Sequence, residues 1–336
     1  MLRGTDRALC DHHDLAMLDL DGVVYIGGEA VPGAAEAIAA ARERDQRIAF
    51  ITNNASRTPE TVAAHLTELG VDAAREDVVT SAQAAARVLV DRLGTGARVA
   101  ALGADGLLEA LREEGLEPVG IDDEADALAT GYGPDVLWRD IMRAAVRVRD
   151  GLWWVASNTD MSIPTAYGTA PGHGVLVETL SRFAGVDPVV AGKPARPLLD
   201  ETVRRVGGAT PLMVGDRLDT DIEGAVGVDM PALLVMTGVT GLAELVAARP
   251  RERPTYLAAD LSGLLQAHPE PTRNDATVAC GGWTAQVDGA ADLVVEGDGS
   301  PDDWWRVVAT AAWEHLDAGG EPVGVDRLRA PGAERR

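Results

Sequence analysis

Short apolar runs alternate with alanine- and leucine-rich segments of helical periodicity along most of this chain. The first run covers residues 15–20 and precedes a helical pattern at 33–44. The next run covers 47–52 and precedes a helical pattern at 59–69, and a short strand is expected at 78–80. Strands that alternate with helices form parallel sheets with right-handed crossovers. The pattern therefore predicts an α/β fold built on a doubly wound parallel sheet.

A second series of the same kind occupies the middle of the chain. Its expected strands and helices are 98–103, 106–114, 138–149, 152–157, 175–184 and 189–191. The first pattern then resumes, with a helix and two strands expected at 197–206, 211–214 and 232–236. We interpret the middle as a domain inserted into the first one. The predicted division is a Rossmann-like core of 1–82 and 187–265 with an inserted α/β cap of 83–186.

The last part of the chain has a different character and predicts a small α+β module at 272–330. A hairpin is expected at 276–287, a strand at 293–296 and an amphipathic helix at 301–317. Four of the seven tryptophans lie in this segment. Large aromatic side chains bury a large apolar area. We therefore expect them to form the core of the module or its contact with the main body.

Two acidic residues follow the first apolar run. Asp19 ends the run, and Asp21 comes two positions later, before Gly22. Open α/β sheets bind ligands at the carboxyl ends of their strands, and residues i and i+2 of an extended chain point the same way. Two carboxylates in one pocket can serve as a nucleophile and an acid–base group. Asp19 and Asp21 are therefore a candidate pair for phosphoryl transfer, a reaction to which a carboxylate nucleophile is suited.

Polar groups also follow the second strand, and one lysine stands alone. A hydroxyl and exposed backbone N–H groups at Thr52, Asn53 and Asn54 can hold phosphate oxygens; the alternative is an asparagine-rich turn that satisfies its own backbone. Lys193 is the only lysine of the chain, so a compact ammonium is preferred there over a guanidinium. We expect Lys193 to neutralise a transferring phosphoryl group and Asp19.

A further acidic segment follows the strand at 211–214. Mg²⁺ prefers few carboxylates, several waters and substrate oxygens, which matches Asp19, Asp216 and a backbone carbonyl. We expect Asp221 to lie behind these ligands and to orient Lys193 or a metal-bound water. Asp219 is expected to face solvent or to cap the following helix.

The composition of the chain mainly excludes certain partners and targeting segments. The formal net charge of −23 argues against nucleic acid and anionic membranes as partners. Residues 1–14 are polar and charged, without an apolar stretch of signal-peptide length, and no run approaches the length of a membrane span. Cys10 and Cys280 give neither a disulfide framework nor a metal-binding spacing, which fits a reducing cytoplasm. His173, between two glycines, is left open between a loop residue and a substrate-binding role.

Taken in order, these motifs resemble those of the haloacid dehalogenase superfamily of phosphatases. The resemblance lies in Asp19-Leu20-Asp21-Gly22, Thr52-Asn53-Asn54, Gly192-Lys193-Pro194 and Gly215-Asp216-Arg217-Leu218-Asp219-Thr220-Asp221. It is to the subgroup with a large α/β cap between the second and third motifs, and residues 157–160 resemble the loop by which that cap meets the core. The resemblance covers about residues 14–260.

The resemblance implies a Mg²⁺-dependent phosphoric monoester hydrolase. It implies that Asp19 is the phosphorylated nucleophile and that Asp21 is the general acid and then the general base. It also implies that Thr52 and Lys193 hold the phosphoryl group, and that Asp19, the carbonyl of Asp21, and Asp216 bind Mg²⁺.

A cap of this size implies a small phosphorylated metabolite as substrate, since it closes over the site. The C-terminal segment resembles the acetyltransferase-like extension of some bacterial members that act on glycerol 3-phosphate, which favours that substrate. Phosphoglycolate, sugar phosphates and nucleotides stay open as alternatives. A regulatory or ligand-binding role of the module and a homodimer formed through the cap also stay open. The segment has no glycine-rich loop for coenzyme A, so no acyl transfer is expected.

Overall fold

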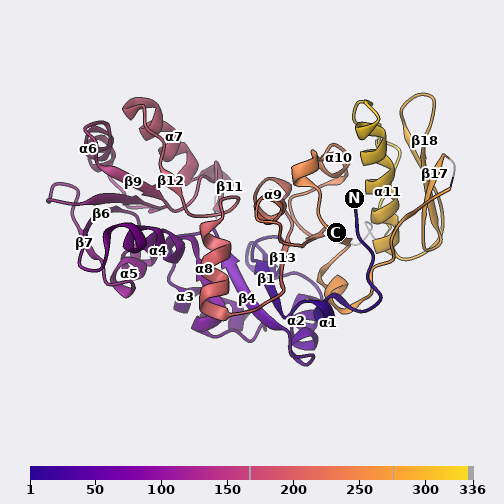
Figure 1. Ribbon diagram of the computed structural model, residues 1–336, viewed down its shortest axis with the longest axis horizontal. Helices are drawn as coiled ribbons and strands as arrows, with labels where there is room; N and C mark the ends of the chain where they lie inside the picture. Colours follow the sequence, from indigo (N-terminus) through magenta and orange to yellow (C-terminus); the bar gives the residue numbers. More distant parts are fainter. Residues whose placement is uncertain (166–167, 275, 332–336) are drawn as a thin grey trace. The chain divides into compact units, whose positions relative to one another are not determined.

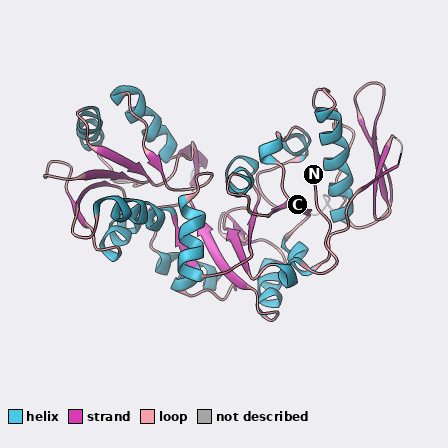
Figure 2. Cartoon of the chain, in the orientation of Figure 1, coloured by secondary structure: helices cyan, strands magenta, loops and turns pink. Residues whose placement is uncertain are grey.

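The computed structural model describes residues 1–165, 168–274 and 276–331 (Figures 1 and 2). Its contacts group the chain into two compact units. The first consists of Met1–Ile48 and Gly208–Arg336, and the second of Ala49–Gly207. The contacts divide the chain into two units, whereas the sequence predicts three parts. The boundaries of the core, the cap and the C-terminal module therefore stay predictions.

The first unit contains parallel strands that are far apart in the sequence. In spatial order they are β15 (Tyr256–Ala258), β14 (Ala232–Val235), β13 (Pro211–Gly215) and β1 (Leu15–Asp19). Met17 lies opposite Met213, and Val214 lies opposite Leu233. These strands are buried along almost their whole length, as expected for parallel strands covered on both faces.

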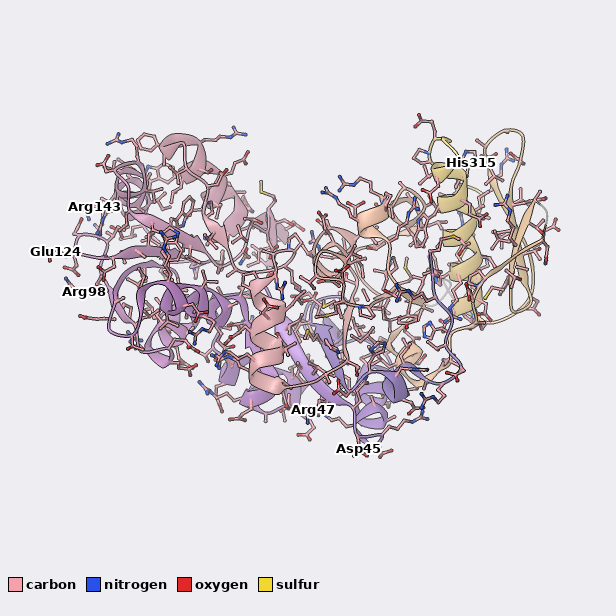
Figure 3. The ribbon with its side chains drawn as sticks, in the orientation of Figure 1. Asp45, Arg47, Arg98, Glu124, Arg143 and His315 are labelled. Atoms are coloured by element: carbon pink, nitrogen blue, oxygen red, sulfur yellow. The ribbon has the colours of Figure 1, made fainter. Side chains whose placement is uncertain are left out.

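Short elements precede or follow these strands along the chain. They are α1 (Leu9–His12), β2 (Tyr25–Ile26), β3 (Glu29–Ala30), α2 (Ala34–Arg42), α9 (Glu223–Val226) and α10 (Leu242–Val246). After α2 the chain turns at Asp45, which has a φ of 63° and is labelled in Figure 3. Aspartate tolerates this left-handed conformation better than most residues do. The N–H of Arg47 then donates to the carbonyl of Asp14, 3.0 Å away, so the chain returns to the residue that precedes β1.

The C-terminal module is a four-stranded antiparallel sheet with one helix, α11 (Pro301–Asp317). Its strands are β16 (Thr272–Asn274), β17 (Thr277–Cys280), β18 (Trp283–Val287) and β19 (Leu293–Gly297). The helix α11 contacts β17, β18 and β19 of this sheet and also β15 and α10. Trp304, Trp305 and Trp313 are buried, and Trp313 Nε1 donates to the carbonyl of Leu245 at 2.8 Å. The predicted packing role of these three tryptophans is confirmed.

The second unit begins within β4 (Arg47–Thr52), which pairs in parallel with β5 (Val78–Thr80). Two helices adjoin this pair, α3 (Pro59–Glu68) and α4 (Ser81–Leu93). Thr80 caps α4, because its hydroxyl accepts from the N–H of Gln83 while the Gln83 side chain accepts from the N–H of Thr80. This capping box fixes the direction in which the chain leaves β5.

A second parallel sheet follows in the order β12-β9-β8-β6-β7. Its strands are β6 (Arg98–Leu102), β7 (Glu117–Val119), β8 (Ala127–Thr130), β9 (Trp153–Ala156) and β12 (Val189–Val190). The helices of this region are α5 (Asp105–Glu113), α6 (Trp138–Arg149) and α7 (His173–Ala184). Figure 1 shows α6 and α7 on one face of the sheet and α4 and α5 on the other. Trp154, Leu128, Val148 and Leu180 form part of the core beneath α6 and α7.

Two further elements complete the second unit. The hairpin β10 (Ser162–Thr165) and β11 (Gly168–Pro171) precedes α7, and α8 (Pro197–Val206) follows β12.

The predicted α/β class with parallel sheets is confirmed. Among the described residues, no helix is both long enough and apolar enough to cross a membrane.

The sequence pattern did not reveal every strand. It missed β8, which lies between β6 and β9 and is wholly buried. Only four residues long and half alanine, this strand carries little of the β-branched and aromatic signal by which strands are recognised. Its neighbours in the sheet decide its conformation.

His268 connects the chain before the module to α11. It is buried, its Nε2 lies 2.9 Å from the carbonyl oxygen of Gly263, and its Nδ1 lies 3.1 Å from Arg306 Nη2. A guanidinium can only donate, so Nδ1 accepts and Nε2 carries the proton. Burial and, next, the positive charge of Arg306 lower the pKa of His268 to about 4, against the hydrogen bond to Gly263 and the charge of Asp303.

This arrangement predicts acid lability of the first unit. An unfolded histidine titrates near 6.5, so the unfolded chain binds an extra proton between pH 6.5 and about 4. The stabilisation is therefore complete above pH 6.5 and is lost as the pH falls, at about 1.4 kcal/mol per pH unit for one histidine. We expect His268→Gln to reduce the pH dependence of the urea midpoint, followed by tryptophan fluorescence between pH 7 and 4.5. Identical slopes for the variant and the wild type would contradict this assignment.

Candidate active site

Three carboxylates meet at the ends of neighbouring strands in the first unit. Asp19 ends β1, Asp216 directly follows β13, and Asp221 lies in the π-helical turn Leu218–Ile222. One oxygen of each carboxylate lies within 4.8 Å of the others. In the part of the chain that the structure describes, this is the one such group of three acidic, histidine or cysteine residues. A set of hard oxygen donors fits Mg²⁺.

The carboxylate of Asp216 is held from the loop after β14. Its Oδ2 accepts from the N–H of Val239 at 2.6 Å, and its main-chain oxygen accepts from the N–H of Thr240 at 3.2 Å. Asp216 is fully buried. The loop therefore orients the carboxylate through these two hydrogen bonds.

Asp221 enters the cluster through an unusual turn. Its Oδ2 accepts from the N–H of Arg217 at 3.1 Å, which closes the turn on itself. Such π-helical turns often occur at functional sites. The turn brings the carboxylate of Asp221 close to those of Asp19 and Asp216. That Asp221 orients groups around the metal, without being a ligand itself, stays a prediction. Asp219 is exposed and pairs with Arg217 at 2.8 Å, so its predicted position toward solvent is confirmed.

Three glycines make the cluster sterically possible. A Cβ on Gly22 would lie 2.4 Å from Asp216 Oδ2, and one on Gly238 would lie 2.0 Å from the same atom. A Cβ on Gly215 would lie 2.3 Å from that of Asp221. Gly22 also has a φ of 86°, a conformation that favours glycine. The backbone thus approaches the carboxylates more closely than any residue with a side chain allows.

Asp21 lies beside the cluster in the sequence but differs from it in exposure. It is exposed, whereas Leu20 and Gly22 on either side are buried. The N–H of Val24 donates to the carbonyl of Leu20 at 2.9 Å and closes a turn that contains Asp21. An exposed carboxylate beside a buried acidic cluster is suited to exchange protons with water or a substrate.

In the second unit, the residues after β4 form a turn with internal hydrogen bonds. Thr52 is buried, and its Oγ1 accepts from the N–H of Asn54 at 3.0 Å. Asn54 Oδ1 accepts in turn from the N–H and the hydroxyl of Ser56, at 2.9 and 2.7 Å. The side-chain oxygen of Asn54 therefore hydrogen-bonds within the turn, as in the alternative of an asparagine-rich turn that satisfies its own backbone.

Lys193 lies in the same unit, in the loop between β12 and α8, and is buried. Its N–H donates to Asn53 Oδ1 at 2.8 Å, and Asn53 Nδ2 donates to its carbonyl at 3.0 Å. A Cβ on Gly192 would lie 2.6 Å from Asn53 Oδ1, which explains the glycine. The structure thus brings the loop of Thr52 and Asn53 together with the loop of Lys193.

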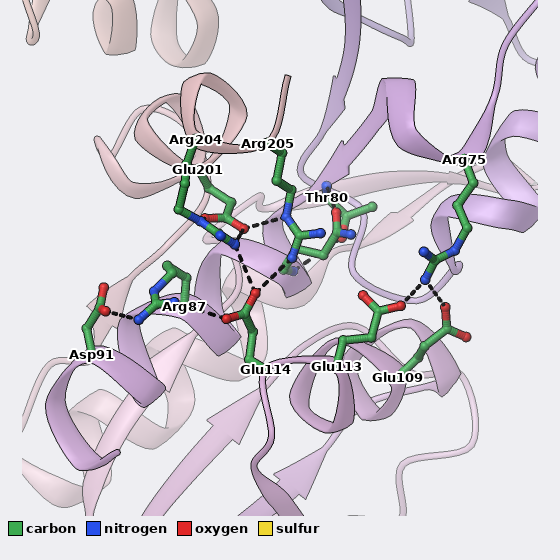
Figure 4. A network of polar contacts seen from close by, with 11 residues as sticks. Arg75, Thr80, Arg87, Asp91, Glu109, Glu113, Glu114, Glu201, Arg204 and Arg205 are labelled. Atoms are coloured by element: carbon green, nitrogen blue, oxygen red, sulfur yellow. Dashed lines mark hydrogen bonds and ion pairs between the residues drawn. The ribbon is translucent and has the colours of Figure 1, made fainter. Parts of the chain in front are cut away.

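An ion-pair network anchors α8, the helix that follows Lys193 (Figure 4). Glu201 of α8 has a side chain only 1% exposed and accepts from Arg204 Nε at 2.7 Å. Arg204 and Arg205 both donate to Glu114 at the end of α5, at 2.9 and 3.0 Å, and Arg87 of α4 reaches Glu114 at 3.1 Å. Partly buried charges must be paired, and Glu114 pairs here with arginines of both α8 and α4. The network therefore joins α8 to α4 and α5.

His173 is the first residue of α7 rather than part of a loop. Its ring is buried, and Nδ1 lies 2.9 Å from the carbonyl oxygen of Asn158. Burial lowers its pKa to about 4, so the ring is neutral and Nδ1 donates to that carbonyl. This hydrogen bond joins the start of α7 to the 157–160 loop, a role that the sequence alone did not reveal.

Comparison with known proteins agrees with these features. The family of haloacid dehalogenase-like hydrolases matches residues 16–117, and a related HAD hydrolase-like family matches residues 190–264. A D-glycerol 3-phosphate phosphatase from Mycobacterium tuberculosis is 41% identical over 324 residues, which is 92% of this chain and 88% of that protein. An acid sugar phosphatase from Staphylococcus saprophyticus is 35% identical over 74% of this chain and 96% of its own length.

A solved structure extends the comparison. The crystal structure of a glycerol phosphate phosphatase from Mycobacterium tuberculosis in complex with magnesium superposes with a TM-score of 0.82 at 41% identity, over 92% of each chain. The chain therefore belongs to the haloacid dehalogenase-like hydrolases. The predicted enzyme class, a phosphoric monoester hydrolase, is confirmed at that level by relatives that are themselves phosphatases by name.

The close approach of Gly22 to Asp216 predicts a specific effect on metal binding. Gly22→Ala would add both backbone strain and a collision with Asp216 Oδ2. Gly27→Ala is the matched control, since Gly27 has a φ of 62° but nothing within 4 Å of the added Cβ. We expect Gly22→Ala to weaken Mg²⁺ binding at least about 10-fold, the size of effect seen when groups around a metal are disturbed. Isothermal titration calorimetry would measure both variants, and equal affinities would overturn this account.

Proposed function

We propose that this protein is a Mg²⁺-dependent phosphatase that hydrolyses glycerol 3-phosphate through an aspartyl-phosphate at Asp19. The observation that carries the proposal is the group of Asp19, Asp216 and Asp221 at the ends of β1 and β13. Likeness to a glycerol phosphate phosphatase crystallised with magnesium supports both the metal and the reaction.

Mg²⁺ is assigned to Asp19, Asp216 and the main-chain carbonyl of Asp21. When bound, it neutralises the acidic cluster and withdraws charge from the oxygens of the phosphoryl group. Asp221 either joins these ligands or orients a water beside them. In the second unit, the Thr52 hydroxyl and the Asn53-Asn54 turn are assigned to the phosphoryl oxygens, together with Lys193. The Lys193 ammonium stabilises the charge on the phosphoryl group during transfer.

The reaction consists of two displacements at phosphorus. In the first, a carboxylate oxygen of Asp19 bonds to phosphorus, the bond to the ester oxygen breaks, and Asp21 gives its proton to the departing alcohol. In the second, Asp21 takes a proton from a water whose oxygen bonds to phosphorus. The Asp19–phosphate bond then breaks, inorganic phosphate leaves, and both carboxyl groups return to their initial states.

The choice of glycerol 3-phosphate rests on how much of the chain the relatives share. The mycobacterial glycerol 3-phosphate phosphatase aligns with 92% of this chain, whereas the staphylococcal acid sugar phosphatase leaves about a quarter of it unmatched while aligning over 96% of its own length. A sugar phosphate is the second candidate because of that relative. Phosphoglycolate and nucleotides are weaker alternatives. The proposed site of action is the cytoplasm, without nucleic-acid or membrane partners.

The packing of α11 bears on the alternative role of the C-terminal module. Trp313 donates to Leu245, and Arg253 pairs with Asp317 at 2.8 Å, so the module is tied to elements of the first unit. These contacts favour a structural role of the module as part of the first unit over a separate regulatory or ligand-binding domain.

The test is phosphate release with Mg²⁺ across a panel of small phosphomonoesters, compared by kcat/KM. We expect the highest value for glycerol 3-phosphate and a loss of at least about 10³-fold in Asp19→Asn, because that variant lacks the nucleophile. Chelation of Mg²⁺ should abolish turnover reversibly. A preference for sugar phosphates would replace the substrate and keep the chemistry. Retained activity in a folded Asp19→Asn variant would refute the mechanism.

We also propose a homodimer formed through the cap. Trp138 and Met142 on α6 are 66% and 55% exposed, and Val146 follows one turn later on the same face. Contiguous exposed apolar side chains of this kind mark protein interfaces.

The dimer has a direct test by sedimentation velocity. We expect the double variant Trp138→Glu with Met142→Glu to be monomeric where the wild type is dimeric, because charge is costly to bury in an interface. Ile26→Glu is the control, since Ile26 is similarly exposed but lies outside the predicted cap. Monomeric wild-type protein, or a dimer that survives the double change, would refute this interface.

A further inference from the structure

The Asn53 side chain holds the Lys193 loop from both sides of one residue. Its Oδ1 accepts from the Lys193 N–H at 2.8 Å, and its Nδ2 donates to the Lys193 carbonyl at 3.0 Å. The same Nδ2 donates its second hydrogen to Asp160 Oδ1 at 3.0 Å. An amide carries two N–H donors, so both donors of Asn53 are engaged within the protein. The Asn53 amide therefore has no donor left for a phosphate oxygen.

The backbone of Asn53 is fixed as firmly as its side chain. Its carbonyl accepts from Asn158 Nδ2 and from Ser81 Oγ, both at 2.6 Å. Asn158 Oδ1 accepts in turn from the N–H of Asp160 at 3.1 Å. All of these groups lie in the second unit, and Asn53, Ser81, Asn158 and Lys193 are buried. Hydrogen bonds in such a buried network are costly to break.

We propose that Asn53 is a positioning residue that acts on catalysis through Lys193. It fixes the main chain of Lys193 and ties it to Asp160, so that the ammonium is presented in one place. This inference rests on the proposed function and deepens it, since it changes the predicted role of the Asn53 side chain from substrate contact to support of the catalytic lysine. The requirement for both a donor and an acceptor on a short side chain explains an asparagine at this position.

The same hydrogen bonds extend toward α7. Asp160 accepts the N–H of Gly174 on its main-chain oxygen at 2.8 Å, and His173 Nδ1 lies 2.9 Å from the carbonyl of Asn158. The loop at 157–160 is therefore held by Asn53 on one side and by the start of α7 on the other. The position of the Lys193 loop is thus coupled to the segment that carries the β10–β11 hairpin.

The experiment uses a donor–acceptor exchange in the full-length protein. Asn53→Asp keeps the size and the acceptor but removes both donors, so a carboxylate would face the Lys193 carbonyl and the Asp160 carboxylate. We expect kcat/KM to fall about 100-fold, the consequence of two buried hydrogen bonds replaced by acceptor–acceptor contacts. Asp160→Asn alone should change little, because an amide oxygen still accepts. Combining the two restores one donor between these positions and should recover at least about 10-fold.

Ser81→Ala is the matched structural control. It removes a buried hydrogen bond to the carbonyl of Asn53, which Asn158 still satisfies, and leaves every bond of the Asn53 side chain intact. We expect Ser81→Ala to lower Tm while kcat/KM stays within about twofold of the wild type. If Ser81→Ala loses as much activity as Asn53→Asp, the effect is one of general stability. That result, or the absence of recovery in the double variant, would overturn the proposal.

Binding of inorganic phosphate separates this proposal from the proposed function. Calorimetry in the presence of Mg²⁺ needs no turnover, and we expect Asn53→Asp to weaken phosphate binding at least about 10-fold through a displaced Lys193. A wild type that hydrolyses no phosphomonoester but shows this pattern of phosphate affinity would refute the proposed function alone. An active wild type whose Asn53→Asp variant keeps both kcat/KM and phosphate affinity would refute the positioning role alone.

Discussion

Mutual repulsion of three carboxylates is the constraint on which the first unit depends. Asp19, Asp216 and Asp221 present oxygens within 4.8 Å of one another. At an effective dielectric constant near 20, each pair of charges at that distance repels by about 3 kcal/mol. The chain's net charge of −23 adds to the cost. Such a cluster is stable when a divalent cation neutralises it, so folding and metal binding would be linked at the proposed catalytic site.

The elements around this cluster serve to bring the three carboxylates together. Parallel pairing of β1 with β13 places Asp19 and Asp216 at the same edge although almost 200 residues separate them. Gly22 and Gly238 keep side chains away from Asp216, and the N–H of Val239 binds its carboxylate. In the order β15-β14-β13-β1, the outermost strand β15 contacts α11 of the C-terminal module. The module is thus an extension of the same folding unit, packed against the outermost strand of these four.

In the second unit, the main structural constraint is the burial of the chain's single lysine, Lys193. A buried ammonium is tolerated only where charge and hydrogen bonds compensate its loss of hydration. The loop of Lys193 is held by Asn53 at one end, and α8 continues from it into the paired charges of Glu201, Arg204 and Glu114. Arginines suit such planar, multiply bonded pairs, whereas lysine is a compact point charge. This division of labour fits a chain that has thirty basic residues and one lysine.

Local sequence determined the parts of this protein that depend on near neighbours. Apolar runs predicted most strands, and the polar residues at their ends pointed to Asp19, Thr52, Lys193 and Asp216 as candidates, because parallel sheets bind ligands where their strands end. Tertiary structure decided what depends on distant partners. The strand β8 pairs with β6 and β9 on either side, and the buried ring of His173, at the start of α7, hydrogen-bonds to the carbonyl of Asn158. Likewise, the side chain of Asn53 is committed to a loop 140 residues away, a pairing that no local pattern contains, since a hydrogen bond depends on where the fold brings its two ends.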